Sequence, residues 1–249
     1  MKKILLVATS IVALSTVAGA GTESHNYIGG GLGWTVVRGN AKTADSSAID
    51  LADNLNAQKG VKIGDEFVSG ALFLGRKFVH GDSAWLIEAK AGKDLSDAKK
   101  DYTYSLPAGI FVAGPAAPYT TSVSLRRQYT LGLAVGYSKD VVKNISAYFK
   151  LSTLFSKFSL NYNTINYAAA PYEHYANTSK KSAFGVGATI GLAKKLQDFS
   201  VGLDYTFEMY QRIKQISAVQ SQEFDGLMSH TSKITPQYHT VMLSVTKEI

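Results

Sequence analysis

The stretch RQYTLGLAVGYSKDVVKNISAYFKLSTLF, residues 127–155, decides the fold. Two runs of strictly alternating residues flank a polar turn at 139–144, and the face opposite the apolar one holds mostly small or polar residues, among them glycine, serine, threonine and one lysine. A period of two is typical of a strand with one apolar face, and about 9 to 11 residues let a tilted strand cross a bilayer. The stretch therefore predicts a hairpin in the wall of a transmembrane barrel. Its apolar face comprises Tyr129, Leu131, Leu133, Val135, Tyr137, Ile145, Ala147, Phe149, Leu151 and Phe155.

The same alternation recurs in six other segments, so that eight strands are predicted in all. The segment 67–79 is the least regular, because Leu72, Phe73 and Leu74 interrupt its alternation. In every segment we expect the apolar face to contact acyl chains and the small or polar face to line the lumen. The segments are approximately 26–38, 67–79, 85–91, 184–192, 199–209 and 241–249.

Short and long connections alternate between these strands. The turns at 80–83, 139–144 and 194–198 are short. Short periplasmic turns and long outer loops are the arrangement of outer-membrane barrels. We therefore predict an all-β, eight-stranded antiparallel up-and-down transmembrane β-barrel over residues 21–249. The long polar connections are approximately 39–66, 95–126, 156–181 and 211–236. All five prolines lie in a connection or at a strand start, where no ladder hydrogen bond is lost: Pro107, Pro115, Pro118, Pro171 and Pro236.

Residues 1–20 have the features of a secretory signal peptide. Lys2 and Lys3 precede an apolar core, and Ala18-Gly19-Ala20 is a small-residue cleavage site. We expect cleavage after Ala20, and a retained N-terminal anchor is the alternative. The rest of the chain has no run of about 18 apolar residues, the length that a membrane helix needs.

The composition excludes several classes of site and partner. The chain has no cysteine, so disulfides, thiolate metal sites, a cysteine nucleophile and a lipid-modified N-terminal cysteine are excluded. The net charge of +7 suits the phosphates of a membrane surface, and it suits the ordinary solubility of loops equally well. No basic groove with interleaved aromatic residues is present, so nucleic acid is not an expected partner.

Aromatic residues mark both ends of the predicted apolar faces. They would form the two girdles at the bilayer interfaces: Trp34, Trp85, Tyr129, Tyr137, Phe155, Phe184, Phe199 and Phe207. With these girdles, the chain resembles the eight-stranded outer-membrane barrels of the OmpA-type and opacity-type surface proteins of Gram-negative bacteria. The resemblance implies contact with outer-membrane lipid and lipopolysaccharide, and insertion by the barrel-assembly machinery. Such barrels usually end in an aromatic residue, whereas this chain ends in Ile249 and carries Lys247 two residues earlier.

A secreted soluble barrel or β-sandwich would show the same alternation with its apolar face turned inward. Two features argue against this alternative. The lipocalin Gly-x-Trp signal is absent, because Trp34 follows Leu32 and Gly33. A soluble fold would also expose long rows of glycine to water.

Five charged residues are predicted to face the lumen. Unpaired charges in a narrow, poorly hydrated interior are costly, so we expect ion pairs across the lumen. Two roles are open: a structural network, or a gate of the kind that the resemblance to OmpA-type barrels implies for a narrow channel. The five residues are Glu88, Lys90, Lys150, Asp204 and Glu208.

A lipid A-modifying enzyme is a second alternative. His230-Thr231-Ser232 has the His-x-Ser spacing of lipid A deacylases of this shape. However, we expect this motif in a loop, and the residue twelve positions after Ser232 is Ser244 rather than an acid. The other histidines lack metal-ligand spacing. We therefore expect neither enzymatic activity nor a metal or cofactor.

The long connections contain two candidate interaction surfaces. One is an apolar run in the second connection, which is either a hairpin extended past the membrane or an exposed tip that binds a host or neighbouring molecule. The other is a Tyr- and Asn-rich segment in the third connection, a composition typical of binding surfaces. The residues concerned are Ile110, Phe111, Val112, Tyr119, Tyr167, Tyr172 and Tyr175.

Basic residues gather where the strands meet the long connections. We expect a ring of cations there that contacts lipopolysaccharide phosphates, formed by Arg126, Arg127, Lys157, Lys180, Lys181 and Arg212. Overall, the sequence favours a non-enzymatic surface protein with a structural or interaction role, and a narrow low-conductance channel is the main alternative.

Overall fold

The computed structural model describes residues 23–47, 59–105, 118–166, 173–220 and 227–249. The predicted signal peptide lies outside these residues and stays a prediction. No helix in the described ranges is long and apolar enough to cross a membrane.

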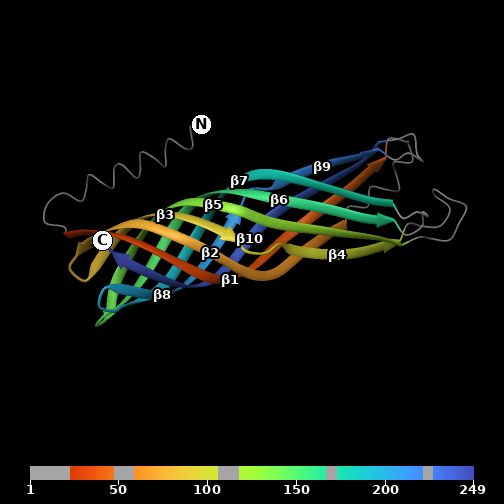
Figure 1. The fold of residues 1–249 in the computed structure, drawn as a ribbon. Coiled ribbons are helices and arrows are strands. Elements are labelled where there is room, and N and C mark those ends of the chain that lie inside the picture. The colour runs from red at the N-terminus through yellow and green to blue at the C-terminus, as the bar shows by residue number, and fades with distance from the viewer. Residues whose placement is uncertain (1–22, 48–58, 106–117, 167–172, 221–226) are drawn as a thin grey trace, which may run out of the picture.

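Ten antiparallel strand segments build the structure (Figure 1). β4 pairs with β5 beyond the end of β3, and β9 pairs with β10 beyond the end of β8, so each continues the wall of the strand before it. β1 also pairs with β10, which closes the sheet. The predicted eight-stranded barrel is confirmed. The segments are β1 (Glu23–Ser47), β2 (Lys59–His80), β3 (Ser83–Asp94), β4 (Ala98–Ser105), β5 (Pro118–Val142), β6 (Ile145–Asn166), β7 (Glu173–Lys195), β8 (Phe199–Tyr210), β9 (Ile213–Gln220) and β10 (Leu227–Glu248).

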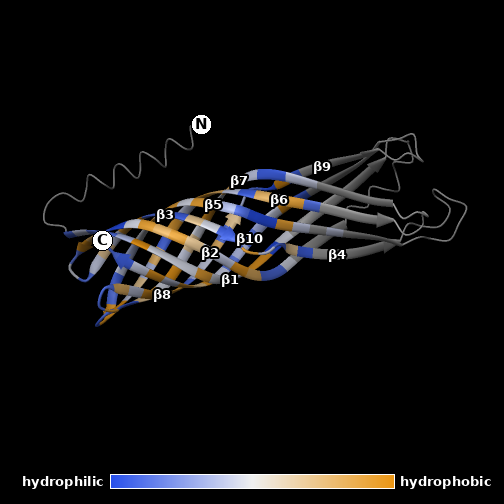
Figure 2. Ribbon diagram, viewed as in Figure 1, coloured by the Kyte–Doolittle hydropathy of each residue, from blue (hydrophilic) through white to orange (hydrophobic). Residues whose placement is uncertain are grey.

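The outside of the barrel is apolar over the part of each strand where the sequence alternates. Figure 2 shows hydrophobic and hydrophilic residues alternating along the strands. Leu131, Leu151 and Leu203 are exposed on the outer wall, whereas Glu88 and Asp204 are buried inside. The ambiguous segment follows the same rule, because Leu72 is 69% exposed and Phe73 only 8%. The apolar face of the sheet is therefore the outer one, as predicted.

The strands continue well past their predicted ends on the extracellular side. β1 and β5 have 25 residues each, and β6 has 22, far more than the roughly 9 to 11 that cross a bilayer. Beyond the bilayer no acyl chains contact the outer face, so this face need not be apolar. The strands there remain hydrogen-bonded, but the sequence lacks the apolar alternation from which a strand is predicted. Much of what the sequence suggested as loop is therefore paired strand.

The prediction that Pro236 lies in a connection is wrong, because it lies within β10 opposite Gly39. On its other side, the pairing of β10 passes from β8 at Gln237 to β9 at Ile234. The missing N–H of the proline thus falls where the neighbouring strand is interrupted, so the ladder loses little.

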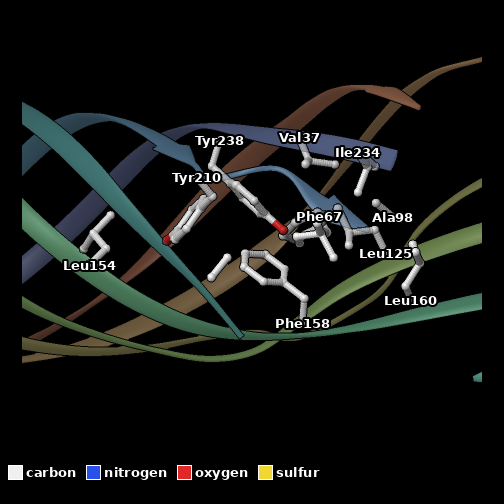
Figure 3. Close-up of a cluster of buried hydrophobic side chains, with 12 residues drawn as sticks. Val37, Phe67, Ala98, Leu125, Leu154, Phe158, Leu160, Tyr210, Ile234 and Tyr238 are labelled. Carbon is white, nitrogen blue, oxygen red and sulfur yellow. The ribbon is translucent and has the colours of Figure 1, made fainter. Parts of the chain in front are cut away.

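An apolar core fills the extracellular part of the barrel (Figure 3). Its members lie at and above the level where the outer wall changes from apolar residues to Arg38, Lys93, Arg126 and Lys157. Aromatic rings meet edge to face at its centre, with 5.1 Å between the centroids of Phe158 and Tyr210. This core consists of Val37, Phe67, Ala98, Leu125, Leu154, Phe158, Leu160, Ala183, Tyr210, Ile213, Ile234 and Tyr238.

We expect Leu125→Ala to lower the free energy of unfolding by about 2–5 kcal/mol, because it leaves a cavity in this core. Leu125 is 1% exposed, whereas Leu95 on the neighbouring segment is 54% exposed. Leu95→Ala is therefore the matched control, with an expected change within about 0.5 kcal/mol. Urea unfolding of the protein in lipid vesicles measures both, and equal losses would contradict the position of the core.

Candidate functional site in the barrel lumen

Two ion pairs cross the lumen below the apolar core. Lys150 Nζ lies 2.9 Å from Glu88 Oε2, and Lys90 Nζ lies 2.8 Å from Glu208 Oε1. Tyr27 donates its hydroxyl hydrogen to the same Glu88 oxygen at 2.8 Å. The lysines are largely shielded from solvent and both carboxylates are buried. The four inward-facing charges of Glu88, Lys90, Lys150 and Glu208 thus neutralise one another in pairs at the middle of the barrel.

Arg127 lies above these pairs in the lumen and contacts both carboxylates and aromatic residues. Its Nη2 lies 2.8 Å from Asp94 Oδ1, and its Nη1 contacts Glu208 and donates to the Tyr210 hydroxyl at 3.1 Å. The guanidinium also lies over the Tyr238 ring, 4.3 Å from its centroid. Arg127 therefore joins the ion pairs below it to the aromatic rings of the apolar core above it.

The prediction that Arg127 belongs to an outward ring of cations is wrong, because this side chain is only 4% exposed and faces the lumen. The register of β5 against β6 shifts between Arg127 and Tyr129, which leaves Gln128 as the extra residue of a β-bulge. The bulge reverses the alternation, so Arg127 faces inward although Tyr129, two residues later, faces outward. Sequence alternation alone gave no sign of it.

Asp94 was also missed, although the alternation could have found it. It has the same parity as the inward residues Glu88 and Lys90 on the same strand. The predicted segment ended too early to include it. Asp94 accepts two further hydrogen bonds from Arg127, one from Nε at 3.0 Å and one from the backbone N–H at 3.2 Å.

Asp204 faces the lumen but takes no cation partner among the described residues. Its Oδ2 accepts a hydrogen bond from Ser244 Oγ at 3.0 Å, and its buried Oδ1 has no partner in the part of the chain described. The buried layers thus contain four carboxylates, of Glu88, Asp94, Asp204 and Glu208, against the cations of Lys90, Arg127 and Lys150. Asp204 carries the surplus acidic group.

Residues 4–239 match the family described as outer membrane protein beta-barrel domain. The chain belongs to this family. As an outer-membrane β-barrel it lies in the bacterial outer membrane, with its short turns in the periplasm.

Several solved outer-membrane proteins are similar to this barrel in overall arrangement. Neisserial surface protein A is 9% identical, with coverage of 91% of this chain and 99% of that one and a TM-score of 0.39. Ail of Yersinia pestis is 10% identical, with coverage of 91% and 99% and a TM-score of 0.37. The outer membrane protease OmpT of Escherichia coli is 9% identical, with coverage of 90% and 97% and a TM-score of 0.39. At these values the similarity carries no argument about function. No curated protein matches the sequence.

The outer-membrane barrel carries all eight predicted girdle residues on its outer wall. Near the periplasmic turns, the rings of Trp85 and Tyr137 meet with 5.4 Å between their centroids. Toward the extracellular side, Phe155 and Phe184 lie 5.2 Å apart. The exposed members are Trp34, Trp85, Tyr129, Tyr137, Phe184 and Phe199, and the half-buried ones are Phe155 and Phe207.

The predicted interaction residues of the long connections are only partly described. Ile110, Phe111, Val112, Tyr167 and Tyr172 lie outside the described residues. Tyr119 and Tyr175 belong to strands β5 and β7 rather than to loops.

The placement of the His230-x-Ser232 motif in a loop is wrong, because both residues belong to β10. Ser244, at the position of the deacylase acid, faces the lumen and hydrogen-bonds Asp204. Among the described residues, no three histidine, aspartate or glutamate side chains are grouped so that they could hold a metal ion.

We expect Arg127→Met to destabilise the outer-membrane barrel by about 3–5 kcal/mol, because it leaves Asp94 without its cation and weakens the neutralisation of Glu208. The adjacent Arg126 is the matched control, since its side chain is 37% exposed and faces outward. Arg126→Met should change stability by about 1 kcal/mol or less. Urea unfolding in vesicles of uncharged lipid measures both variants, and the reverse order of effects would contradict the bulge.

Proposed function

We propose that the chain is a sealed outer-membrane barrel that acts at the cell surface as a structural or interaction protein, and that it is neither a channel nor an enzyme. The observation that carries this proposal is the filled lumen. Charged pairs occupy its middle and an apolar core occupies its extracellular part. In this view the barrel is a support, inserted by the barrel-assembly machinery, and its role lies in the part that projects from the membrane.

The filling of the lumen argues against the narrow channel. An eight-stranded barrel is just wide enough for its own side chains to fill it. A permeating ion would first have to pass Phe67, Phe158 and Tyr238, which are buried together and offer only the Tyr238 hydroxyl in place of a hydration shell. It would then have to break the contacts of Arg127 with Asp94 and Glu208.

The length of the strands supports a role at the cell surface. Paired strands carry the chain far beyond the apolar band, so the extracellular hairpins stand on a stiff, internally packed base. Binding residues commonly lie on loops that a rigid scaffold positions. The segments 106–117, between β4 and β5, and 167–172, between β6 and β7, contain most of the apolar run and part of the tyrosine-rich sequence.

We expect the purified protein to show no regular single-channel openings in planar bilayers. Lys150→Met should behave in the same way, because the apolar core above Lys150 still closes the lumen. A general porin recorded in the same bilayers provides the positive control. Reproducible openings of the wild type that change in the variant would favour a gated channel and contradict the proposal.

Replacement of 106–117 and 167–172 by short turns should leave the barrel folded and abolish its binding to cells or matrix. Retention of the fold follows because neither segment belongs to the paired strands that the structure describes. Gel migration before and after boiling reports the fold, and adhesion of bacteria expressing either protein reports binding. Unchanged adhesion of the variant would contradict an interaction through these segments.

A further inference from the structure

We propose that the edge of β7 above the membrane binds an extended acidic segment of a partner protein, which adds to the sheet as a further strand. The inference rests on the interaction role proposed above and names a class of partner for it. Its site lies in the wall of the extracellular part of the barrel, apart from the segments 106–117 and 167–172. Three observations lead to it: the end of the ladder between β7 and β8, the unpaired edge above that point, and the charge beside this edge.

Above the apolar band, β7 and β9 are neighbours in the wall without being paired to each other. The ladder between β7 and β8 ends at Gly185 and Tyr210, and one more backbone hydrogen bond follows, from Gln211 N–H to Phe184 C=O at 2.8 Å. Beyond it β7 pairs only with β6 and β9 only with β10, and no ladder joins β7 to β9 in the part of the chain that the structure describes. A seam between β7 and β9 therefore runs from Phe184 toward the extracellular end (Figure 1).

The edge of β7 along this seam offers backbone groups for pairing. Successive residues of an antiparallel strand direct their N–H and C=O to opposite sides. Because the C=O of Phe184 points to the side of the seam, the backbone groups of Ser182, Lys180 and Thr178 do so as well, and the residues between them bond to β6. None of the described residues bonds to these groups. Such a row is a template on which an extended peptide can add as a strand.

The corresponding seam between β2 and β4 is bridged by a side chain of the barrel itself. The ladder between β2 and β3 also ends with one further bond, from Leu95 N–H to Val68 C=O at 3.0 Å. Next to it, the Asp65 carboxylate accepts hydrogen bonds from the backbone N–H groups of Glu66 and Lys99, each at 2.8 Å. Asp65 thus joins the edges of β2 and β4, whereas no described side chain bridges β7 and β9. The seam between β7 and β9 is therefore the one open to a partner.

The charge beside the open seam selects the partner. Four exposed cations border its base, and none of them forms an ion pair with a described residue: Lys180, Lys181, Arg212 and Lys214. Lysines on a strand edge oppose pairing with other strands, and like charges on paired strands are destabilising. A second copy of this chain, which carries the same cations on the same edge, is therefore disfavoured. Opposite charges stabilise cross-strand pairs, so the occupant that fits is an acidic strand.

Three short synthetic peptides test the edge on the wild-type protein folded in detergent micelles. The first alternates threonine and glutamate. The second has the same sequence with methyl groups on its central backbone nitrogens, which removes hydrogen-bond donors from both of its edges and leaves its charge unchanged. The third has lysine in place of glutamate. We expect the first peptide to bind, and the second and third to bind about tenfold more weakly or less, because one lacks the ladder and the other is repelled.

A pair of proline variants tests the position of the site. Thr178→Pro removes an N–H that points into the open seam, and the ladder to β6 is kept because it uses the neighbouring residues. Gly64→Pro is the matched control, since Gly64 has the parity of Val68 and so faces the seam that Asp65 bridges. We expect Thr178→Pro to weaken binding of the acidic peptide about fivefold, and Gly64→Pro to leave it within about twofold.

Equal binding of the first two peptides would show recognition by charge alone and overturn strand addition. Equal effects of the two proline variants would overturn the position on β7. If Thr178→Pro does not show the gel migration of a folded barrel, the three peptides on the wild type decide.

The variant with 106–117 and 167–172 replaced by short turns separates this inference from the proposed function. It should bind the acidic peptide as the wild type does, whether or not its adhesion is lost, because the seam lies outside both segments. Loss of peptide binding in this folded variant would overturn the site on the edge of β7. Unchanged adhesion together with peptide binding would contradict the role of the two segments and support the edge.

Discussion

The structure depends on the pairing of β1 with β10, which removes the two free edges that an eight-stranded sheet would otherwise have. In hydrocarbon an unpaired backbone N–H or C=O has no water to bond, so a sheet can cross the bilayer only when it is closed. The register of this pairing continues from Tyr27–Glu248 to Ser47–Met228, along almost the whole length of β1. Closure over eight strands also fixes the width of the lumen. A lumen of this width is filled by the side chains of the barrel itself.

The side chains that fill the narrow lumen differ between the membrane-spanning part of the barrel and the part above the bilayer. Within the bilayer the lumen contains charges, because the apolar residues of these strands are used on the lipid side. Above the bilayer the outer wall meets water, and the apolar residues are free to turn inward around Phe158 and Tyr238. Arg127 lies where the two fillings meet, with carboxylates on one side of its guanidinium and aromatic rings on the other.

The sequence predicted the membrane part of the fold well because lipid imposes a contrast between the two faces of each strand. Leu131, Leu151 and Leu203 could be placed on the outer wall from their spacing alone. The continuation of β1 to Ser47 and of β6 to Asn166 could not be predicted, since water on the outside removes that contrast.

The charged residues of the lumen could likewise be predicted wherever the strand alternates regularly, and they could not be predicted elsewhere. The alternation places five charged residues inside the barrel: Glu88, Lys90, Lys150, Asp204 and Glu208. It would also have placed Asp94 there if the predicted strand had been longer. Arg127 depends on one unpaired residue, Gln128, which no periodic pattern reveals.

The bulge at Gln128 also restricts how β5 can change in length. Odd-numbered residues of β5 face the lumen before Gln128 and face outward after it. The facing of each half of the strand therefore depends on the extra residue at this position. Deletion of Gln128 alone would leave a regular ladder, because Arg127 and Tyr129 would then be adjacent residues on opposite faces. Deletion of a residue within the run from Tyr129 to Tyr137 would instead turn part of that run toward the lumen. Single-residue insertions and deletions in this wall strand should therefore be tolerated at its extracellular end, as should the loss of Gln128 itself, and rejected within the membrane-spanning run, even where single substitutions are harmless.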